Sequence, residues 1–223
     1  MARTPVLLSW SSGKDSAWSL YELLRQDDVE VVGLLTTVNE THDRVAMHAV
    51  RRELLEAQAA AADLPLWVVD LPWPCTNEEY EKRMSVVVAR AEREGIREMA
   101  FGDLFLEDIR AYREEKLDGT GLKPRFPLWG RPTDELAREM LAGGLRAVLT
   151  CVDPKQGAAE FVGRAYDQDL LEALPDSVDP CGENGEFHTF VHAGPMFREP
   201  ILIAVGEVVE RGGFQFADVS KVS

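Results

Sequence analysis

Cysteine is scarce in this sequence, and the residues present, Cys75, Cys151 and Cys181, are widely spaced. They form no CxxC pair, so we expect no disulfide framework. Free cysteines are typical of a reducing compartment, and the chain is therefore expected to be cytoplasmic. No apolar run approaches the ~20 residues of a transmembrane helix, and no signal peptide precedes the first apolar run, so no membrane attachment is expected.

Positive charge is also in short supply. The 24 Lys and Arg residues are outnumbered by 39 Asp and Glu, which gives a formal net charge of -15. Nonspecific binding to nucleic acid requires a basic surface, and the chain has no basic stripe with interleaved aromatic residues, so no nucleic-acid partner is expected. The negative charge is expected to serve solubility, and any anion site must create its own positive field.

Apolar residues make up 45% of the 223 residues, which is enough for one large domain, or for a domain with an appendage. In the first half, four apolar runs alternate with helical patterns. This order predicts an α/β fold with parallel strands, right-handed crossovers and helices on both faces of the sheet. The predicted strands are Val6–Leu8, Val29–Thr37, Leu66–Leu71 and Glu98–Phe101, and the helices are Ala17–Leu24, Ala49–Ala62, Thr76–Glu94 and Leu104–Lys116.

The second half has a different character. A helix beginning near Pro132 and a strand at Leu145–Val152 are followed by a helical stretch at Gly163–Leu174. The last fifty or so residues then read as a small antiparallel α+β unit, whose hairpin joins Pro200–Glu210 to Phe214–Val219. We place the domain boundary between residues 117 and 131, which divides the chain into domains 1–120 and 121–223.

A polar turn joins the first strand to the first helix, and it reads Ser11-Ser12-Gly13-Lys14-Asp15-Ser16. Free N–H groups and the helix dipole make such a helix start suitable for anions. A glycine allows close backbone approach, and the lysine supplies a charge suited to phosphate. The turn is not a Walker A loop, because Asp15 follows Gly13-Lys14 and Leu8 occupies the position of the first glycine. The alternative is an ordinary capped helix start, which the order of strand, turn and helix makes less favourable.

Two further positions follow strands of the same sheet, where open α/β sheets bind ligands. Thr36 and Thr37 are placed to meet a nucleotide base or ribose, although they are equally typical of β-branched residues that fill a strand. Gly102-Asp103 follows the fourth strand. Asp103 is interpreted as a residue that holds a metal-bound water or orients Lys14, or as the N-cap of the next helix.

A second cluster of titratable residues follows Pro180, in the stretch Cys181–His192. Asn184-Gly185 predicts a turn, and a strand after it would alternate its side chains between two faces. Glu186, His188, Phe190 and His192 would then share one face, and Phe187, Thr189 and Val191 the other. Three interpretations are open: acid–base or substrate chemistry, a transition-metal site that includes Cys181, and a polar turn leading to a surface strand. The density of titratable residues favours the first, with Glu183 free to reach a ligand.

These stretches resemble a known family. Ser11–Ser16 resembles the PP-loop, Ser-Gly-Gly-x-Asp-Ser, of enzymes that split ATP into AMP and pyrophosphate, with Ser12 in place of the first glycine. The chain as a whole resembles the diphthine–ammonia ligase family of the PP-loop ATP pyrophosphatase, or adenine nucleotide alpha hydrolase, superfamily. The motifs that carry this resemblance are the PP-loop, Met47-His48, Gly102-Asp103, Pro127-Leu128-Trp129, the segment GENGEFHTF at 182–190, and Gly194-Pro195-Met196-Phe197.

The resemblance implies a Rossmann-like (HUP-type) sheet and an ATP-dependent amidation. A substrate carboxylate would attack the α-phosphate of ATP, and ammonia taken from solution would then displace AMP. The substrate implied is a modified histidine on elongation factor 2. The alternatives are a PP-loop pyrophosphatase with another substrate, a non-catalytic adenine-nucleotide-binding module, and a sulfur-transferring enzyme acting on RNA. The residues leave open whether the protein forms a homodimer.

The resemblance also implies roles for individual residues. Lys14, Glu183, Glu186 and His188 would be catalytic, and His48, Asn184 and Thr189 would contact the substrate. Asp15 or Asp103 would hold Mg²⁺ through water. The ATP-binding residues would be Ser9, Ser11, Ser12, Gly13, Lys14, Asp15, Ser16, Thr36, Thr37, Gly102 and Asp103.

Overall fold

The fold contains two β-sheets of different kinds. The structure is a computed structural model that describes residues 2–41, 44–45, 50–156 and 159–222. The first sheet is mostly parallel, as the alternation of strands and helices predicts, and β1 is flanked by β2 and β5. Strand β4 pairs with the second half of β2. The strands of this sheet are β1 (Thr4–Ser9), β2 (Val29–Asn39), β3 (Arg44–Val45), β4 (Leu66–Leu71), β5 (Glu98–Ala100) and β6 (Lys123–Arg125).

Helices cover both faces of the parallel sheet. Successive side chains of β1 point to opposite faces, so they pack against different helices. Val6 and Leu8 pack in a core that includes residues of α1 and α2, whereas Leu7 packs in a second core with residues of α3 and α4. The prediction of an α/β fold with helices on both faces is therefore confirmed. The four helices are α1 (Lys14–Leu24), α2 (Arg52–Ala62), α3 (Asn77–Arg93) and α4 (Glu107–Leu117).

The second sheet is antiparallel and has β7 at its centre, paired with β9, β8 and β11. A hairpin joins β10 to β11, as predicted. The helix predicted at Gly163–Leu174 is wrong in its first turn, because Ala165–Tyr166 pairs with β7 and Asp167 caps the helix by accepting from Leu170 N–H at 2.8 Å. The elements are α5 (Thr133–Ala142), β7 (Arg146–Val152), β8 (Ala165–Tyr166), α6 (Gln168–Ala173), β9 (Phe187–Ala193), β10 (Ile203–Arg211) and β11 (Phe214–Lys221).

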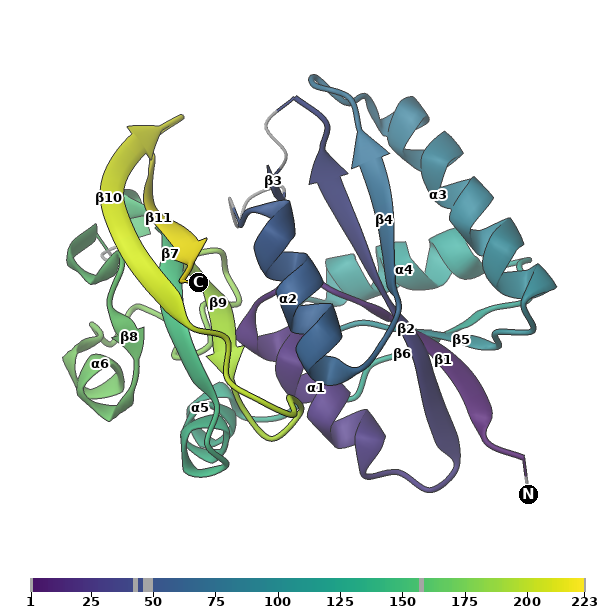
Figure 1. The fold of residues 1–223 in the computed structure, drawn as a ribbon, viewed down its shortest axis with the longest axis horizontal. Coiled ribbons are helices and arrows are strands. Elements are labelled where there is room, and N and C mark those ends of the chain that lie inside the picture. Colours follow the sequence, from purple (N-terminus) through teal and green to yellow (C-terminus); the bar gives the residue numbers. More distant parts are fainter. Residues whose placement is uncertain (1, 42–43, 46–49, 157–158, 223) are drawn as a thin grey trace.

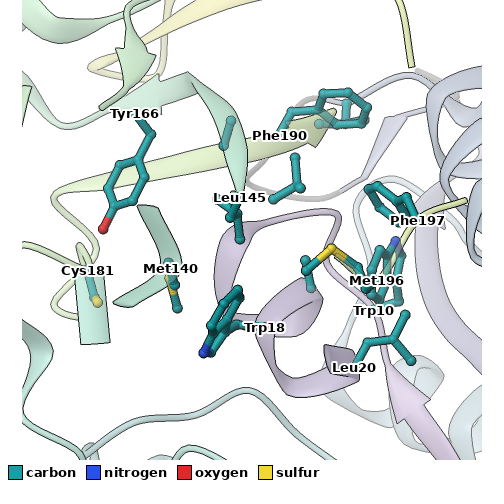
Figure 2. Packing of buried hydrophobic residues seen from close by; sticks show 14 of the residues in the cluster. Trp10, Trp18, Leu20, Met140, Leu145, Tyr166, Cys181, Phe190, Met196 and Phe197 are labelled. Carbon is teal, nitrogen blue, oxygen red and sulfur yellow. The ribbon is translucent and has the colours of Figure 1, made fainter. Parts of the chain in front are cut away.

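Helices α1 and α2 lie between the two sheets, with α3 on the other side of the parallel sheet (Figure 1). The core of α1 and α2 continues without a break into the antiparallel sheet, so that Trp18 of α1 and Phe190 of β9 belong to the same buried cluster (Figure 2). Trp10 packs edge-on against Phe197, with ring centroids 6.3 Å apart. Burying a large apolar side chain contributes roughly 2–3 kcal/mol, so this shared core fixes the start of α1 relative to the second sheet. Among the described residues, no helix is both long and apolar enough to cross a bilayer.

Candidate active site

A cavity of about 1000 Å³ opens at the carboxyl ends of β1, β2 and β5. The polar turn before α1 lines it on one side, and the segment that precedes and begins β9 lines it on another. From there the cavity continues between α3 and α4. Its position agrees with the rule that open α/β sheets bind ligands at the carboxyl ends of their strands.

The turn before α1 has the geometry of an anion site. Gly13 precedes the first residue of α1 in an extended conformation, and the hydroxyls of Ser11 and Ser16 lie 3.2 Å apart. Gly102 packs directly on this helix start, since a Cβ there would lie 3.0 Å from the backbone of Asp15 and Ser16. The predicted nucleotide residues that line the cavity are Ser9, Ser11, Gly13, Lys14, Asp15, Ser16, Thr36, Thr37, Gly102 and Asp103.

Ser12 is an exception among these residues. It is fully buried and adopts φ 75°, a left-handed conformation that glycine prefers, which fits its place at a PP-loop glycine. Its carbonyl oxygen accepts hydrogen bonds from Val191 N–H and Gln58 Nε2, both at 3.0 Å. Gln58 also donates to the Val191 carbonyl at 2.7 Å and accepts from Trp10 Nε1 at 2.8 Å. One glutamine of α2 thus holds the turn against β9.

The second cluster of titratable residues folds over the turn. Thr189 Oγ1 accepts from Lys14 N–H at 3.0 Å, and Lys14 Nζ donates to the carbonyl oxygen of Cys181 and to Asp15 Oδ2. Glu183 Oε1 accepts from Leu104 N–H at 2.7 Å. Segments far apart in the sequence therefore meet at the start of α1, as the interpretation of both clusters as one site requires.

The electrostatics of this meeting point differ from residue to residue. Burial lowers the pKa of Lys14, but Asp15, Cys181 and Glu183 together more than offset it, so the ammonium stays charged with a raised pKa. Burial, aided by Asp15, raises the pKa of Glu183 to about 7. Burial and the Lys14 charge lower the pKa of His188 to about 4. At neutral pH the cavity therefore holds a charged lysine, a neutral imidazole and a carboxyl group near its midpoint.

Other residues of the predicted cluster lie elsewhere. Glu186 Oε1 accepts from Asp179 N–H at 2.9 Å and from Asn184 Nδ2 at 3.0 Å, so both side chains brace the turn, and neither is among the described residues that line the cavity. His192 lines a separate hollow, because the pairing of β7 with β9 shifts register at this position. The prediction that His188 and His192 share one face is therefore wrong. His48 lies outside the described residues.

The carboxylates of this site could hold a metal ion, whereas its buried thiol is unsuited to act as a nucleophile. Within the part of the chain that the structure describes, no three His, Cys, Asp or Glu side chains form a metal-binding group. Asp15 Oδ1 and Asp103 Oδ2 are nevertheless buried without a hydrogen-bond partner among the described residues, and carboxylates of this kind suit Mg²⁺ held jointly with phosphates. Helix α4 begins at Glu107 after Leu106, so the interpretation of Asp103 as its N-cap is wrong. Burial raises the pKa of the Cys181 thiol, which disfavours a thiolate nucleophile.

Buried polar atoms without partners are rare in folded proteins, and here they gather around the cavity. Of eight such side-chain atoms in the described residues, four belong to residues that line it. Two of these are the carboxylate oxygens of Asp15 and Asp103, and the others are Thr36 Oγ1 and Arg113 Nε. The sequence reasoning missed Arg113 and Gln58, because an arginine on a charged helix and a glutamine among alanines carry no distinguishing pattern.

The fold and the site together define a two-sheet α/β protein with a PP-loop-type turn at the carboxyl edge of its parallel sheet. Comparison with known proteins takes the assignment further. Residues 3–124 match the model of the diphthamide synthase N-terminal domain, and residues 132–222 match that of the diphthamide synthase C-terminal domain. The chain belongs to the diphthamide synthase family.

Individual relatives agree with this assignment. A diphthine–ammonia ligase of Rattus norvegicus is 24% identical over 231 residues, covering 94% of this chain and 86% of the relative. The diphthine–ammonia ligase of Homo sapiens is 25% identical over 235 residues with the same coverage. That of Schizosaccharomyces pombe is 26% identical over 219 residues, but these cover only 36% of the yeast protein. All three relatives carry the name diphthine–ammonia ligase.

Proposed function

We propose that this protein is an AMP-forming, ATP-dependent amidating ligase that acts as a diphthine–ammonia ligase. One observation carries the proposal: the Glu183–Thr189 segment lies against the PP-loop-type turn, where Thr189 accepts from Lys14 N–H. It also lies against the segment after β5, where Glu183 accepts from Leu104 N–H. A site that only bound a nucleotide would not need this cluster of titratable groups. Membership of the diphthamide synthase family supports the same activity.

In the proposed arrangement, residues 1–120 bind ATP and residues 121–223 complete the catalytic site. The N–H groups that follow Lys14 at the start of α1 cradle the phosphates, since Thr189 accepts from Lys14 N–H, and the hydroxyls of Ser11 and Ser16 lie beside them. Lys14 stabilises negative charge on the α-phosphate. Thr36 and Thr37 contact the base or the ribose, and the partnerless Thr36 hydroxyl supports that role.

The reaction proceeds in two steps, adenylation of the substrate and then amide formation. The substrate carboxylate attacks the α-phosphate, and pyrophosphate leaves as an acyl-adenylate forms. Ammonia then attacks the acyl carbon, AMP leaves, and an amide remains. Glu183, whose pKa lies near neutrality, accepts the proton that ammonium must lose. Neutral His188 orients the incoming nitrogen, and Glu186 fixes the turn that carries both.

The partnerless oxygens of Asp15 and Asp103 would hold Mg²⁺, directly or through water. When bound, this ion supplies neutralisation of the pyrophosphate charge. The proposed partners are ATP, ammonium from solution and a modified histidine on elongation factor 2, and the proposed location is the cytoplasm. No role for nucleic acid or membrane is proposed.

The test is incubation of the purified protein with ATP, Mg²⁺, ammonium and elongation factor 2 that carries diphthine. We expect AMP and pyrophosphate in equal amounts, both dependent on the acceptor protein, together with one new amide per AMP. Release of ADP and phosphate would contradict the PP-loop chemistry. Tight ATP binding without acceptor-dependent AMP would identify a non-catalytic nucleotide-binding module instead.

A further inference from the structure

The cavity is larger than the phosphate site at the start of α1, and its remaining part lies between α3 and α4. Met99 and Phe101 of the β5 region line this part, together with Met84 and Val88 of α3 and Tyr112 of α4. Met84 and Val88 are only partly buried, and Tyr112 is 38% exposed. We call this part the α3–α4 compartment; it is apolar, open to solvent and continuous with the phosphate site.

Arg113 stands where the compartment meets the phosphate site. Its guanidinium lies 4.9 Å from the centroid of the Phe101 ring, and it forms an ion pair with Asp103 in which Nε and Oδ2 are 3.7 Å apart, too far for a hydrogen bond. That Nε is buried and has no hydrogen-bond partner among the described residues. A guanidinium close to an aromatic ring, with an Nε that makes no hydrogen bond, is suited to a carboxylate, which it can bind through two parallel hydrogen bonds.

The negative charge of the whole chain makes a cation in the cavity important for binding an anion. With a formal net charge of -15, the protein repels anions unless a local cation receives them. The helix start and Lys14 already serve phosphate on the other side of Asp103. Two more cations line the described cavity: Lys116, which pairs with Glu81 at 2.7 Å, and Arg113, whose contact with Asp103 is longer at 3.7 Å. Arg113 lies beside the apolar side chains, which suits an organic carboxylate with a hydrocarbon or aromatic body.

We propose that the α3–α4 compartment binds the acceptor side chain, and that Arg113 is the positioning residue that holds its carboxylate toward the α-phosphate. This rests on the proposed ligase function and specifies where that reaction receives its acceptor. The rim of the compartment faces solvent, because Tyr112, Lys116 and Glu81 line it and are exposed. Lys116 of α4 and Glu81 of α3 form a surface ion pair there, with 2.7 Å between Nζ and Oε1. The acceptor thus enters between two helices of the first sheet, while the second sheet supplies groups for ammonia.

The first test replaces Arg113 with Met, which keeps an unbranched side chain over Phe101, and compares it with Arg110→Met. Arg110 lies on the same helix, but it stacks on Phe126 and Trp129 and pairs with Glu114. With the acceptor protein varied at saturating ATP, we expect R113M to lower kcat/KM for the acceptor roughly 10- to 100-fold. ATP affinity, measured by titration calorimetry, should change less than about twofold, and R110M should behave like wild type in both assays.

A second pair of variants tests the compartment without touching a charge. Ser85 lines it, whereas the next residue, Val86, is 65% exposed and does not occur among the described lining residues. Ser85→Trp should obstruct the acceptor and raise its KM, with ATP affinity retained, and Val86→Trp should do neither. Both tryptophans lie on the outside of α3, so folding should survive.

The outcomes separate the two proposals. A wild-type enzyme that forms AMP and pyrophosphate, with R113M and S85W unchanged toward the acceptor, would overturn the compartment and leave the ligase standing. R113M that loses ATP affinity at unchanged acceptor KM would place Arg113 in the nucleotide site and also overturn it. A wild type without acceptor-dependent AMP would overturn both.

Discussion

The two parts of the cavity are built by different means. At the start of α1, buried polar groups are joined by hydrogen bonds between residues as much as 175 positions apart, such as Lys14 N–H to Thr189. Between α3 and α4, partly exposed apolar side chains lie beneath surface ion pairs such as Lys116–Glu81. A buried polar network fixes atoms closely because each unmet group is costly, whereas an open apolar surface adapts to shape. Under the proposed function, the fixed geometry lies at the phosphate site and the adaptable surface lies where the acceptor would bind.

The largest expected effect is on the lysine of the fixed part. Lys14→Ala removes the charge proposed to stabilise the α-phosphate, and loss of such a group lowers kcat by roughly 10²–10³ or more. It also leaves Asp15 without its ion-pair partner, so a stability loss of about 1–3 kcal/mol is expected. AMP formation and urea unfolding measure the two effects, with the surface variant Lys155→Ala as control. Unchanged turnover would remove Lys14 from the mechanism.

Next in size is the loss of the glutamine that joins the turn to β9. Gln58→Leu removes the hydrogen bonds that Gln58 makes with Trp10 Nε1 and the Val191 carbonyl, and one of the two at the Ser12 carbonyl. We expect a loss of about 2–4 kcal/mol in unfolding free energy. Lys116→Ala, which breaks the ion pair over the compartment, should leave the urea midpoint unchanged, because exposed pairs contribute little. Equal losses of unfolding free energy in both variants would show that the start of α1 and the α3–α4 compartment are stabilised to the same extent by these contacts.

A smaller effect concerns pH. The pKa of Glu183 is raised to about 7 in the folded protein, so its contribution to stability is present below the unfolded value of about 4.5 and is lost as pH rises through about 7. Glu183→Gln does not titrate and keeps an oxygen for Leu104 N–H. The variant should therefore gain roughly 1–2 kcal/mol over wild type between pH 4.5 and pH 8, after allowance for partial exposure. Urea unfolding at the two pH values measures this.

His188 provides the matched control with the opposite sign. Its pKa is lowered to about 4, so its contribution is present above the unfolded value of about 6.5 and is lost as pH falls through about 4. His188→Gln should flatten stability on the acid side only. If both variants showed wild-type pH profiles, the two groups would not lie in the buried surroundings described for the turn.

The smallest effect concerns Ser12. Its left-handed backbone costs a side-chain-bearing residue roughly 1–2 kcal/mol, and its buried hydroxyl has no partner among the described residues. Ser12→Gly should relieve that strain, and the greater freedom of glycine in the unfolded chain offsets part of the gain. We expect a net stabilisation of about 0.5–1 kcal/mol by thermal unfolding, with ATP affinity retained. A loss of stability would mean that the hydroxyl contributes to the fold.

Local pattern predicted much of this molecule, and contacts across the chain account for what it missed. The parallel sheet followed from alternating runs, because burial on both faces leaves a strong trace in strands such as Val29–Asn39. The β8 strand was missed because Ala165–Tyr166 is too short to show a period, and it exists only through its pairing with β7. The register shift near His192 likewise arises between strands and leaves no trace within one.

The site divides in the same way. The turn at Ser11–Ser16 was recognisable because strand, turn and helix start are consecutive in sequence. Its closure by Glu183 and Thr189 was inferred only through a resemblance, and the bonds that achieve it join residues 79 and 175 positions apart. Gln58 and Arg113 act through the geometry of neighbours on other elements, which no spacing within α2 or α4 expresses.

The core shared by the two sheets has a consequence for how the enzyme would turn over. Swinging the sheets apart would bring Trp10, Trp18 and Phe190 into water, at roughly 2–3 kcal/mol for each side chain. Such an excursion would be rare, so the cavity would not open by separation of the two sheets. In the proposed reaction, pyrophosphate and AMP would then leave while the two sheets stay packed together.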